Sequence, residues 1–242
     1  MPVDRFGPEV AERYDERYAY LESPDVVDPI VDFLAEQARD GAVLELGVGT
    51  GRIALPLSAR GVSVHGIDLS EAMVAELRAK PGAARIRVTM GDFSDTTIDG
   101  TFSLAYLVAN TIMNLTEQDE QVACFRNVAA HLEPGGRFVI EVLVPGLQRL
   151  PPGTRFQPFD VRSEHLGFDE IDVATQRLVS HHYWVEDGVL QVIAPPFRYV
   201  WPSELDLMAQ LAGMTLRERW GDWTREPFTN ESTKHVSVWE KP

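Results

Sequence analysis

Short apolar runs alternate with amphipathic segments over residues 1–145 of the chain. Apolar runs bounded by glycine, aspartate or asparagine are typical of buried strands, which we predict at residues 42–46, 62–67, 86–90, 102–109 and 137–144. Helical spacing predicts helices over residues 53–59, from a Ser70 cap to residue 80, and over 117–132 behind a Thr116 cap. Strands that alternate with helices form parallel sheets, so the pattern predicts an α/β fold.

Two more helices are predicted ahead of the first strand, over residues 8–21 and 24–37. The second has an apolar stripe formed by Ile30, Val31, Phe33 and Leu34, and it begins with a proline behind Ser23. Acidic residues outnumber basic ones in this region. We expect residues 1–40 to form a helical lid over the rest of the chain.

The pattern changes after residue 145. Residues 176–185 and 189–193 flank a hairpin turn signal at residues 186–188, and residues 197–201 predict a third antiparallel strand. A helix at 202–213 and strands at 216–220 and 235–240 then resume the earlier pattern. We therefore interpret residues 146–201 as an antiparallel insertion, and residues 41–145 with 202–242 as one α/β domain.

A glycine-rich loop, ELGVGTG at residues 45–51, lies between the first strand and its helix. Gly47 and Gly49 allow a tight turn and close approach of a ligand to the backbone. Asp68 ends the second strand, where a carboxylate can accept hydrogen bonds from a ribose diol. Asp92 and Phe93 end the third strand, where they could contact an adenine ring. The GxGxG spacing differs from the GxGxxG loop of dinucleotide enzymes, and Glu45 suits a ligand with an amino-acid end.

The motifs ELGVGTG, GIDLS and GDF, followed by LEPGGRFVIE at residues 132–141, resemble those of the class I S-adenosylmethionine-dependent methyltransferases. The resemblance covers residues 43–144. It implies a Rossmann-like, mostly parallel seven-stranded sheet whose last strand is antiparallel, and S-adenosylmethionine as the cofactor. It also implies a set of cofactor-binding residues: Tyr14, Gly47, Gly49, Asp68, Leu69, Met73, Asp92, Phe93, Ala109 and Asn110.

The composition limits the kinds of molecule that the protein is expected to bind. The chain has 242 residues, 22 basic and 37 acidic, and a formal net charge of -15, which disfavours nucleic acids and anionic membranes. The single cysteine, Cys124, excludes an intramolecular disulfide and a cysteine-based metal site. No apolar segment is long enough to span a membrane. We expect a cytoplasmic enzyme without a metal, either a monomer or a homodimer, that acts on a small molecule.

Methyl transfer from a sulfonium is an in-line displacement, which requires alignment of the reacting atoms and exclusion of water. A hydroxyl acceptor also needs a base, whereas a neutral amine does not. His181 or His182 could be that base, although adjacent strand residues face opposite sides. Tyr14 and Tyr18 share a helix face from which an aromatic ring could lie against the sulfonium.

The N-terminal tyrosines and the insertion are similar to those of methyltransferases that N-methylate amino sugars carried on nucleotides. This likeness implies an acceptor site formed by the insertion, with Tyr18, Asn114, Arg155, Arg198 and Tyr199 as candidate substrate-binding residues. N-methylation of such a sugar in natural-product or antibiotic biosynthesis is the leading hypothesis, and O-methylation of a small natural product is the alternative. A nicotinamide-dependent oxidoreductase and a non-catalytic nucleoside-binding protein are the rivals from other classes.

Overall fold

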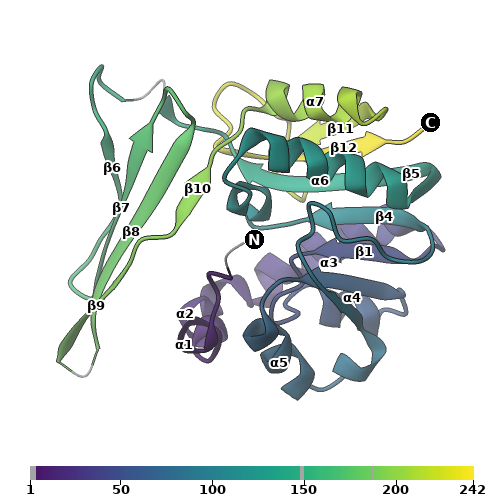
Figure 1. Cartoon of the computed structure of the whole chain (residues 1–242), viewed down its shortest axis with the longest axis horizontal. Coiled ribbons are helices and arrows are strands. Elements are labelled where there is room, and N and C mark those ends of the chain that lie inside the picture. The colour runs from purple at the N-terminus through teal and green to yellow at the C-terminus, as the bar shows by residue number, and fades with distance from the viewer. Residues whose placement is uncertain (1–3, 148–149, 187) are drawn as a thin grey trace.

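The computed structural model describes residues 4–147, 150–186 and 188–242. Seven strands form the main sheet in the order β11-β12-β5-β4-β1-β2-β3 (Figure 1). Their bounds are β1 Val43–Leu46, β2 Val64–Asp68, β3 Arg87–Met90, β4 Phe102–Leu107, β5 Leu132–Leu143, β11 Thr215–Trp220 and β12 Lys234–Glu240. The five strands from β1 to β5 are parallel, whereas β12 is antiparallel to both of its neighbours. The predicted fold is confirmed.

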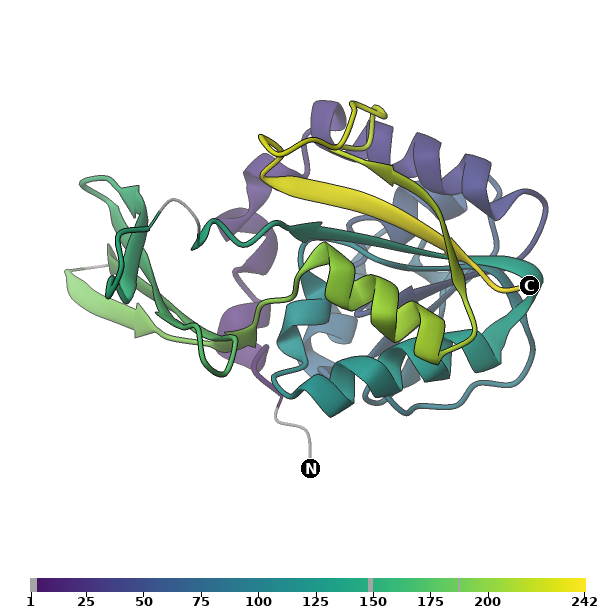
Figure 2. The same cartoon turned by 90° about the horizontal axis from the view of Figure 1, so that it is seen from above.

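Helices cover both faces of this sheet, as the view from above shows (Figure 2). They are α3 Pro24–Ala38, α4 Ala54–Ala59, α5 Glu71–Ala79, α6 Gln118–His131 and α7 Pro202–Leu211. The apolar residues of α6 and α7 pack on one face against Leu44 and Leu107, and those of α3 and α4 pack on the other face against Val43 and Leu104. Neighbouring residues of each strand thus enter opposite cores, so the central strands are apolar on both faces.

The insertion is a second, antiparallel sheet that projects from the main body (Figure 1). It contains β6 Phe156–Val161, β7 His165–Asp172, β8 Arg177–Glu186, β9 Val189–Ile193 and β10 Pro196–Arg198. The order is β10-β8-β7-β6, and β9 also pairs with β8. The predicted count of three strands was wrong, because β6 and β7 contain Pro158, Gly167 and several acidic residues and have weak apolar alternation. Asp187, in the predicted hairpin turn, lies outside the described residues.

The predicted helix at residues 8–21 is broken into α1 Pro8–Ala11, α2 Tyr14–Arg17 and the 3₁₀ turn η1 Ala19–Leu21. Arg13 and Tyr18 leave helical geometry, with φ near -110° in both. Two contacts link the pieces to the glycine loop and the residue after it, since Thr50 Oγ1 donates to Asp15 at 2.6 Å and Arg52 donates to the carbonyl of Leu21 at 3.3 Å. These contacts fix α2 and η1 against the main domain in the interrupted geometry.

The predicted Ser70 cap is confirmed, because its hydroxyl accepts from the N–H of Met73. The predicted Thr116 cap is wrong by one position. Glu117 is the N-cap of α6, and its side chain and that of Glu120 each accept a backbone N–H in a reciprocal capping box. Among the described residues, no helix combines the length and apolar character that crossing a membrane requires.

Candidate functional site

A cavity of about 290 Å³ opens at the carboxyl ends of β1, β2 and β4. The strand order reverses between β1 and β4, the place where open α/β sheets bind ligands. All of the predicted cofactor-binding residues except Asn110 line this cavity, namely Tyr14, Gly47, Gly49, Asp68, Leu69, Met73, Asp92, Phe93 and Ala109. One predicted substrate-binding residue, Asn114, lines it as well. The glycine loop and three strand ends thus converge on one space, although their individual roles stay predictions.

The glycine loop requires residues without a Cβ. Gly47 has φ +73°, and a Cβ there would lie 2.8 Å from Cγ2 of Thr111. Gly49 has φ +53°, and its Cβ would lie 3.3 Å from Cε of Met73. L-residues rarely adopt these backbone angles, and the absent Cβ atoms leave room at the cavity wall.

The carboxylate of Asp68 organises the loop. Its Oδ2 accepts from the N–H of Gly49 at 2.6 Å, and its Oδ1 accepts from the N–H of Ser70 at 2.8 Å. Burial raises the pKa of Asp68, and these two hydrogen bonds act against that shift. Each carboxylate oxygen can accept more than one hydrogen bond, so the group can also receive the hydroxyls of a ribose.

Glu45 lies at the base of the cavity with 3% of its surface exposed. The hydroxyl of Tyr106 donates to its Oε2 at 2.8 Å. Burial is the largest cause that raises the pKa of Glu45 to about 8, partly offset by Tyr106 and by the positive charge of Arg52. The glycine motif pointed to Glu45, but no sequence signal distinguished Tyr106 from the other apolar residues of β4.

The N-terminal segment contributes four residues to the cavity lining. Asp4, Arg5, Phe6 and Tyr14 belong to its lining, and the rings of Phe6 and Tyr14 meet edge to face with centroids 6.1 Å apart. Burial raises the pKa of Tyr14 to about 12. Tyr18 packs on Tyr14 at 4.8 Å but lies outside the lining.

Polar contacts fasten this segment to the main sheet. Ser70 Oγ donates to the carbonyl of Phe6 at 2.7 Å, and Asp15 forms an ion pair with Lys80. Arg5 donates to the carbonyls of Asn114 and Pro196. These contacts join the N-terminal segment to both the cofactor half and the insertion. Within the predicted lid, α3 packs against the sheet and contributes no residue to the cavity lining, and the lid role of residues 1–40 stays a prediction.

Asn110 does not line the cavity, although its neighbour Ala109 does. The Asn110 side chain turns toward β5, where its Oδ1 accepts from the N–H of Leu143 at 2.8 Å. Both residues have positive φ, +53° for Ala109 and +64° for Asn110, so the chain turns sharply as β4 ends. The position of Asn110 fits a role in shaping this turn.

The two candidate histidines lie in the insertion, on β8, and neither lines the cavity. His181 lies 3.4 Å from Glu170 and stacks on Phe168. His182 contacts His165 at 3.0 Å, and burial, then the charge of His165, lowers the pKa of His182 to about 4. Their predicted catalytic role stays a prediction.

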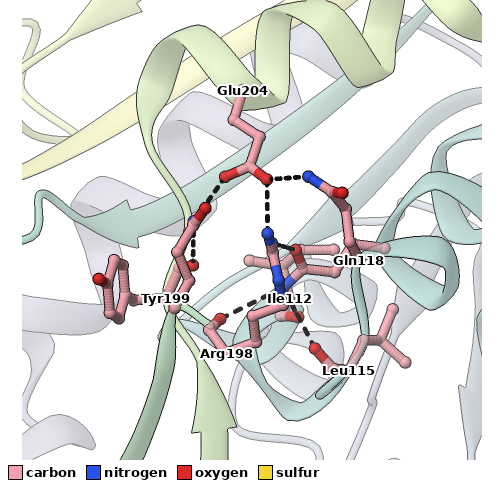
Figure 3. A network of polar contacts seen from close by, with 8 residues as sticks. Ile112, Leu115, Gln118, Arg198, Tyr199 and Glu204 are labelled. Carbon is pink, nitrogen blue, oxygen red and sulfur yellow. Dashed lines mark hydrogen bonds and ion pairs between the residues drawn. The ribbon is translucent and has the colours of Figure 1, made fainter. Parts of the chain in front are cut away.

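Three predicted substrate-binding residues also lie outside the cavity lining. Arg155 is exposed and paired with Glu170 at 2.6 Å. Arg198 is 4% exposed and donates to Glu204 at 2.7 Å, within the buried network of Figure 3. Tyr199 is buried beside it, and its backbone carbonyl accepts from Gln176. The structure therefore separates these residues from the converging strand ends.

The charge of the lining suits S-adenosylmethionine. It contains five carboxylates against two arginines: Asp4, Glu45, Asp68, Asp92 and Glu120 against Arg5 and Arg52. The buried carboxylates can receive an ammonium and a ribose diol, and the acidic excess favours a cation over a diphosphate. Groups of histidine, cysteine and acidic residues with metal-binding geometry are absent from the described part of the chain.

Comparisons with known proteins agree with this geometry. A family model described as a methyltransferase domain matches residues 43–136. The CcbJ methyltransferase from Streptomyces caelestis is 36% identical, with 98% of this chain and 97% of that chain covered and a TM-score of 0.87. Cypemycin N-terminal methyltransferase from a Streptomyces species is 29% identical over 204 residues, which are 82% of each protein.

CalS10 from Micromonospora echinaspora, an amino pentose methyltransferase solved with S-adenosylmethionine, shares the fold. Its identity is 21%, with 95% of this chain and 96% of that chain covered and a TM-score of 0.72. The match to CcbJ extends over nearly the whole length of both chains, and the ordered motifs line the cavity. Together these findings establish membership of a family as well as a shared fold. The chain belongs to the class I S-adenosylmethionine-dependent methyltransferases, enzymes that take their methyl group from that cofactor.

Proposed function

We propose that this enzyme transfers the methyl group to an amine of a small natural product. The observation that carries the proposal is that the described cavity lining contains no histidine or lysine that could take a proton from the acceptor. Each of its five carboxylates already accepts a hydrogen bond from the protein, the donors being the N–H groups of Phe6, Gly49, Ser94 and Glu117 and the hydroxyl of Tyr106.

A neutral amine suits such a site because its lone pair attacks without prior loss of a proton. A hydroxyl would have to transfer its proton to a base as it attacks. Tyr14 is unsuited to that task, since a phenol with a pKa of about 12 stays protonated at neutral pH. O-methylation would therefore have to use one of the lining carboxylates that already accept hydrogen bonds from the protein, which makes it the less favoured alternative.

The enzyme's own contribution is alignment and exclusion of water. The bound cofactor supplies an electrophilic methyl group on a cationic sulfur. Phe6 and Tyr14 close the cavity from the N-terminal side, and the face of an aromatic ring there favours a cation. Holding the amine in line with the methyl group supplies most of the rate enhancement available to a displacement of this kind.

An amino sugar remains a member of the proposed acceptor class, but the charges argue against a nucleotide carrier. Every arginine in the described part of the insertion has a carboxylate partner: Arg155 with Glu170, Arg162 with Asp160, Arg177 with Glu117, and Arg198 with Glu204. A diphosphate would have to displace one of these partners. We therefore favour an acceptor without a diphosphate.

The relatives support an amine. The cypemycin enzyme is named for methylation of an N-terminus, and CalS10 is described as an amino pentose methyltransferase. Both names refer to amine-bearing acceptors, one a peptide and the other a sugar. The proposal extends this common chemistry, and neither particular substrate, to the present chain.

The test compares matched acceptors that differ only in the attacking atom. A free aminodeoxy sugar, its nucleotide-linked form and a short peptide with a free N-terminus are each paired with the corresponding alcohol. Mass spectrometry measures the methylated product and the release of S-adenosylhomocysteine. We expect methylation of amines alone, with a rate that rises as the acceptor ammonium loses its proton. Methylation of an alcohol in preference to its amine would refute the proposal, and a strong preference for the nucleotide-linked sugar would restore the carrier.

A further inference from the structure

Glu45 and Tyr106 are direct partners across two neighbouring strands. Glu45 on β1 pairs in register with Tyr106 on β4, so the two side chains emerge on the same face of the sheet. Tyr106 is completely buried, and its hydroxyl has one hydrogen-bond partner among the described residues, Oε2 of Glu45 at 2.8 Å. On the other side of β1 the partner of Glu45 is Gly66, which has no side chain to offer. Tyr106 is thus the neighbouring-strand residue that contacts this carboxylate.

The hydroxyl contact constrains both the orientation and the charge of Glu45. Oε2 is directed at Tyr106, the backbone N–H of Ala54 also donates to the carboxyl group, and the side chain held in this way lines the cavity. Burial disfavours the ionised carboxylate, whereas a hydrogen bond donated to it favours ionisation. Arg52 adds a positive charge from the same wall. The environment therefore keeps a buried carboxyl group close to ionisation, so that a cationic ligand can complete the change.

We propose that Tyr106 is a positioning residue for the cofactor, whose hydroxyl orients Glu45 and favours its ionised form for contact with the α-ammonium of the methionine moiety. Tyr106 itself does not line the cavity. It acts through Glu45, as an outer residue that fixes the geometry of a ligand-binding group. The inference rests on the assigned cofactor and is independent of the acceptor, so failure of the amine proposal would leave it unchanged.

The test uses two ligands that differ at the amino-acid end. S-adenosylhomocysteine carries the ammonium, whereas 5′-methylthioadenosine keeps the nucleoside and the sulfur without it. Titration calorimetry on the full chain measures both affinities from pH 6 to 9 for the wild type and for Tyr106→Phe. We expect Tyr106→Phe to weaken S-adenosylhomocysteine by about tenfold at pH 7. The affinity for 5′-methylthioadenosine should stay within about twofold, because that ligand makes no contact that depends on Glu45.

The pH profile separates positioning from a merely structural role. Loss of the Tyr106 hydroxyl should raise the pH above which S-adenosylhomocysteine binds tightly, because Glu45 then ionises less readily. Site-specific 3-fluorotyrosine at position 106 has nearly the same shape and a more acidic hydroxyl, so it should move that pH downward. This second substitution also keeps the test valid if Tyr106→Phe folds poorly.

Tyr183→Phe is the matched control, since Tyr183 lies on β8 of the insertion and stacks on Phe168 at 5.9 Å. It should leave both affinities and the pH profile unchanged. Equal weakening of the two ligands by Tyr106→Phe would overturn the proposal, because it would indicate general damage to the site. Unchanged binding of S-adenosylhomocysteine by Tyr106→Phe would overturn it as well. So would a shift to higher pH of the binding profile in the 3-fluorotyrosine variant.

Discussion

Replacing the buried Arg198 with alanine is expected to lower the melting temperature while leaving cofactor affinity unchanged. Arg198 ends β10, next to the start of α7, and its guanidinium donates to Gln121 of α6 at 2.5 Å and to Glu204 of α7 at 2.7 Å (Figure 3). It therefore ties the insertion to two helices of the main domain. Arg155, predicted from the sequence to bind the same substrate, is exposed and paired with Glu170.

The structure sets the size of the effect. Removing one partner of a buried ion pair typically costs about 3–5 kcal/mol, and Arg198 and Glu204 are 5% and 14% exposed in their side chains. Glu204 keeps hydrogen bonds from Gln118 at 2.6 Å and Gln176 at 2.8 Å, which compensate part of its charge. We therefore expect a loss near the lower limit, about 3 kcal/mol. For a protein of this size that corresponds to a fall of roughly 6–12 °C in melting temperature.

The assay is thermal unfolding followed by circular dichroism, with titration of S-adenosylhomocysteine on the same samples. Arg155→Ala is the control, expected to shift the melting temperature by no more than about 4 °C, since exposed ion pairs contribute about 0–1 kcal/mol. A small shift for Arg198→Ala together with a large rise in the KM of the acceptor would refute the reasoning. That pattern would instead show that Arg198 binds substrate, as the sequence suggested.

Other substitutions test the cofactor site. Asp68→Ala is expected to weaken S-adenosylhomocysteine by about 1.5–3 kcal/mol, measured by calorimetry, and an unchanged affinity would remove Asp68 from the site. Gly47→Ala should abolish cofactor binding, because its Cβ would lie 2.8 Å from Thr111. Gly153→Ala is the control, since Gly153 also has a positive φ but has open space around it. Equal affinities for the cofactor in the two variants would contradict this account. Burial raises the pKa of Glu45 from 4.5 to about 8, so the folded protein retains a proton that the unfolded chain loses between these values. The free energy of unfolding should therefore fall as pH rises through that window, and urea unfolding of Glu45→Gln should lack this contribution to the slope.

Local sequence patterns were sufficient where one element determines its own structure. The glycine loop, the Ser70 cap and the alternation of buried strands with helices were all predicted correctly, because backbone freedom, capping and apolar periodicity act over a few residues. They were insufficient where a distant contact overrides the local preference. The helix predicted at residues 8–21 is interrupted, and its pieces are held by Thr50 and Arg52 through contacts with Asp15 and Leu21.

The sequence by itself determined the fold class, the family and the strand ends that would meet at the cofactor site. Those features follow from ordered motifs whose spacing is local, and parallel strands bring their ends together at one edge of the sheet. Only the tertiary structure decided which charged residues are available for binding. The sequence gives no reason to treat Arg198 and Arg155 differently, yet Arg198 is buried against Glu204 and Arg155 is exposed. The role of Tyr106 likewise depends on its register with Glu45, 61 residues earlier in the chain, which no local pattern encodes.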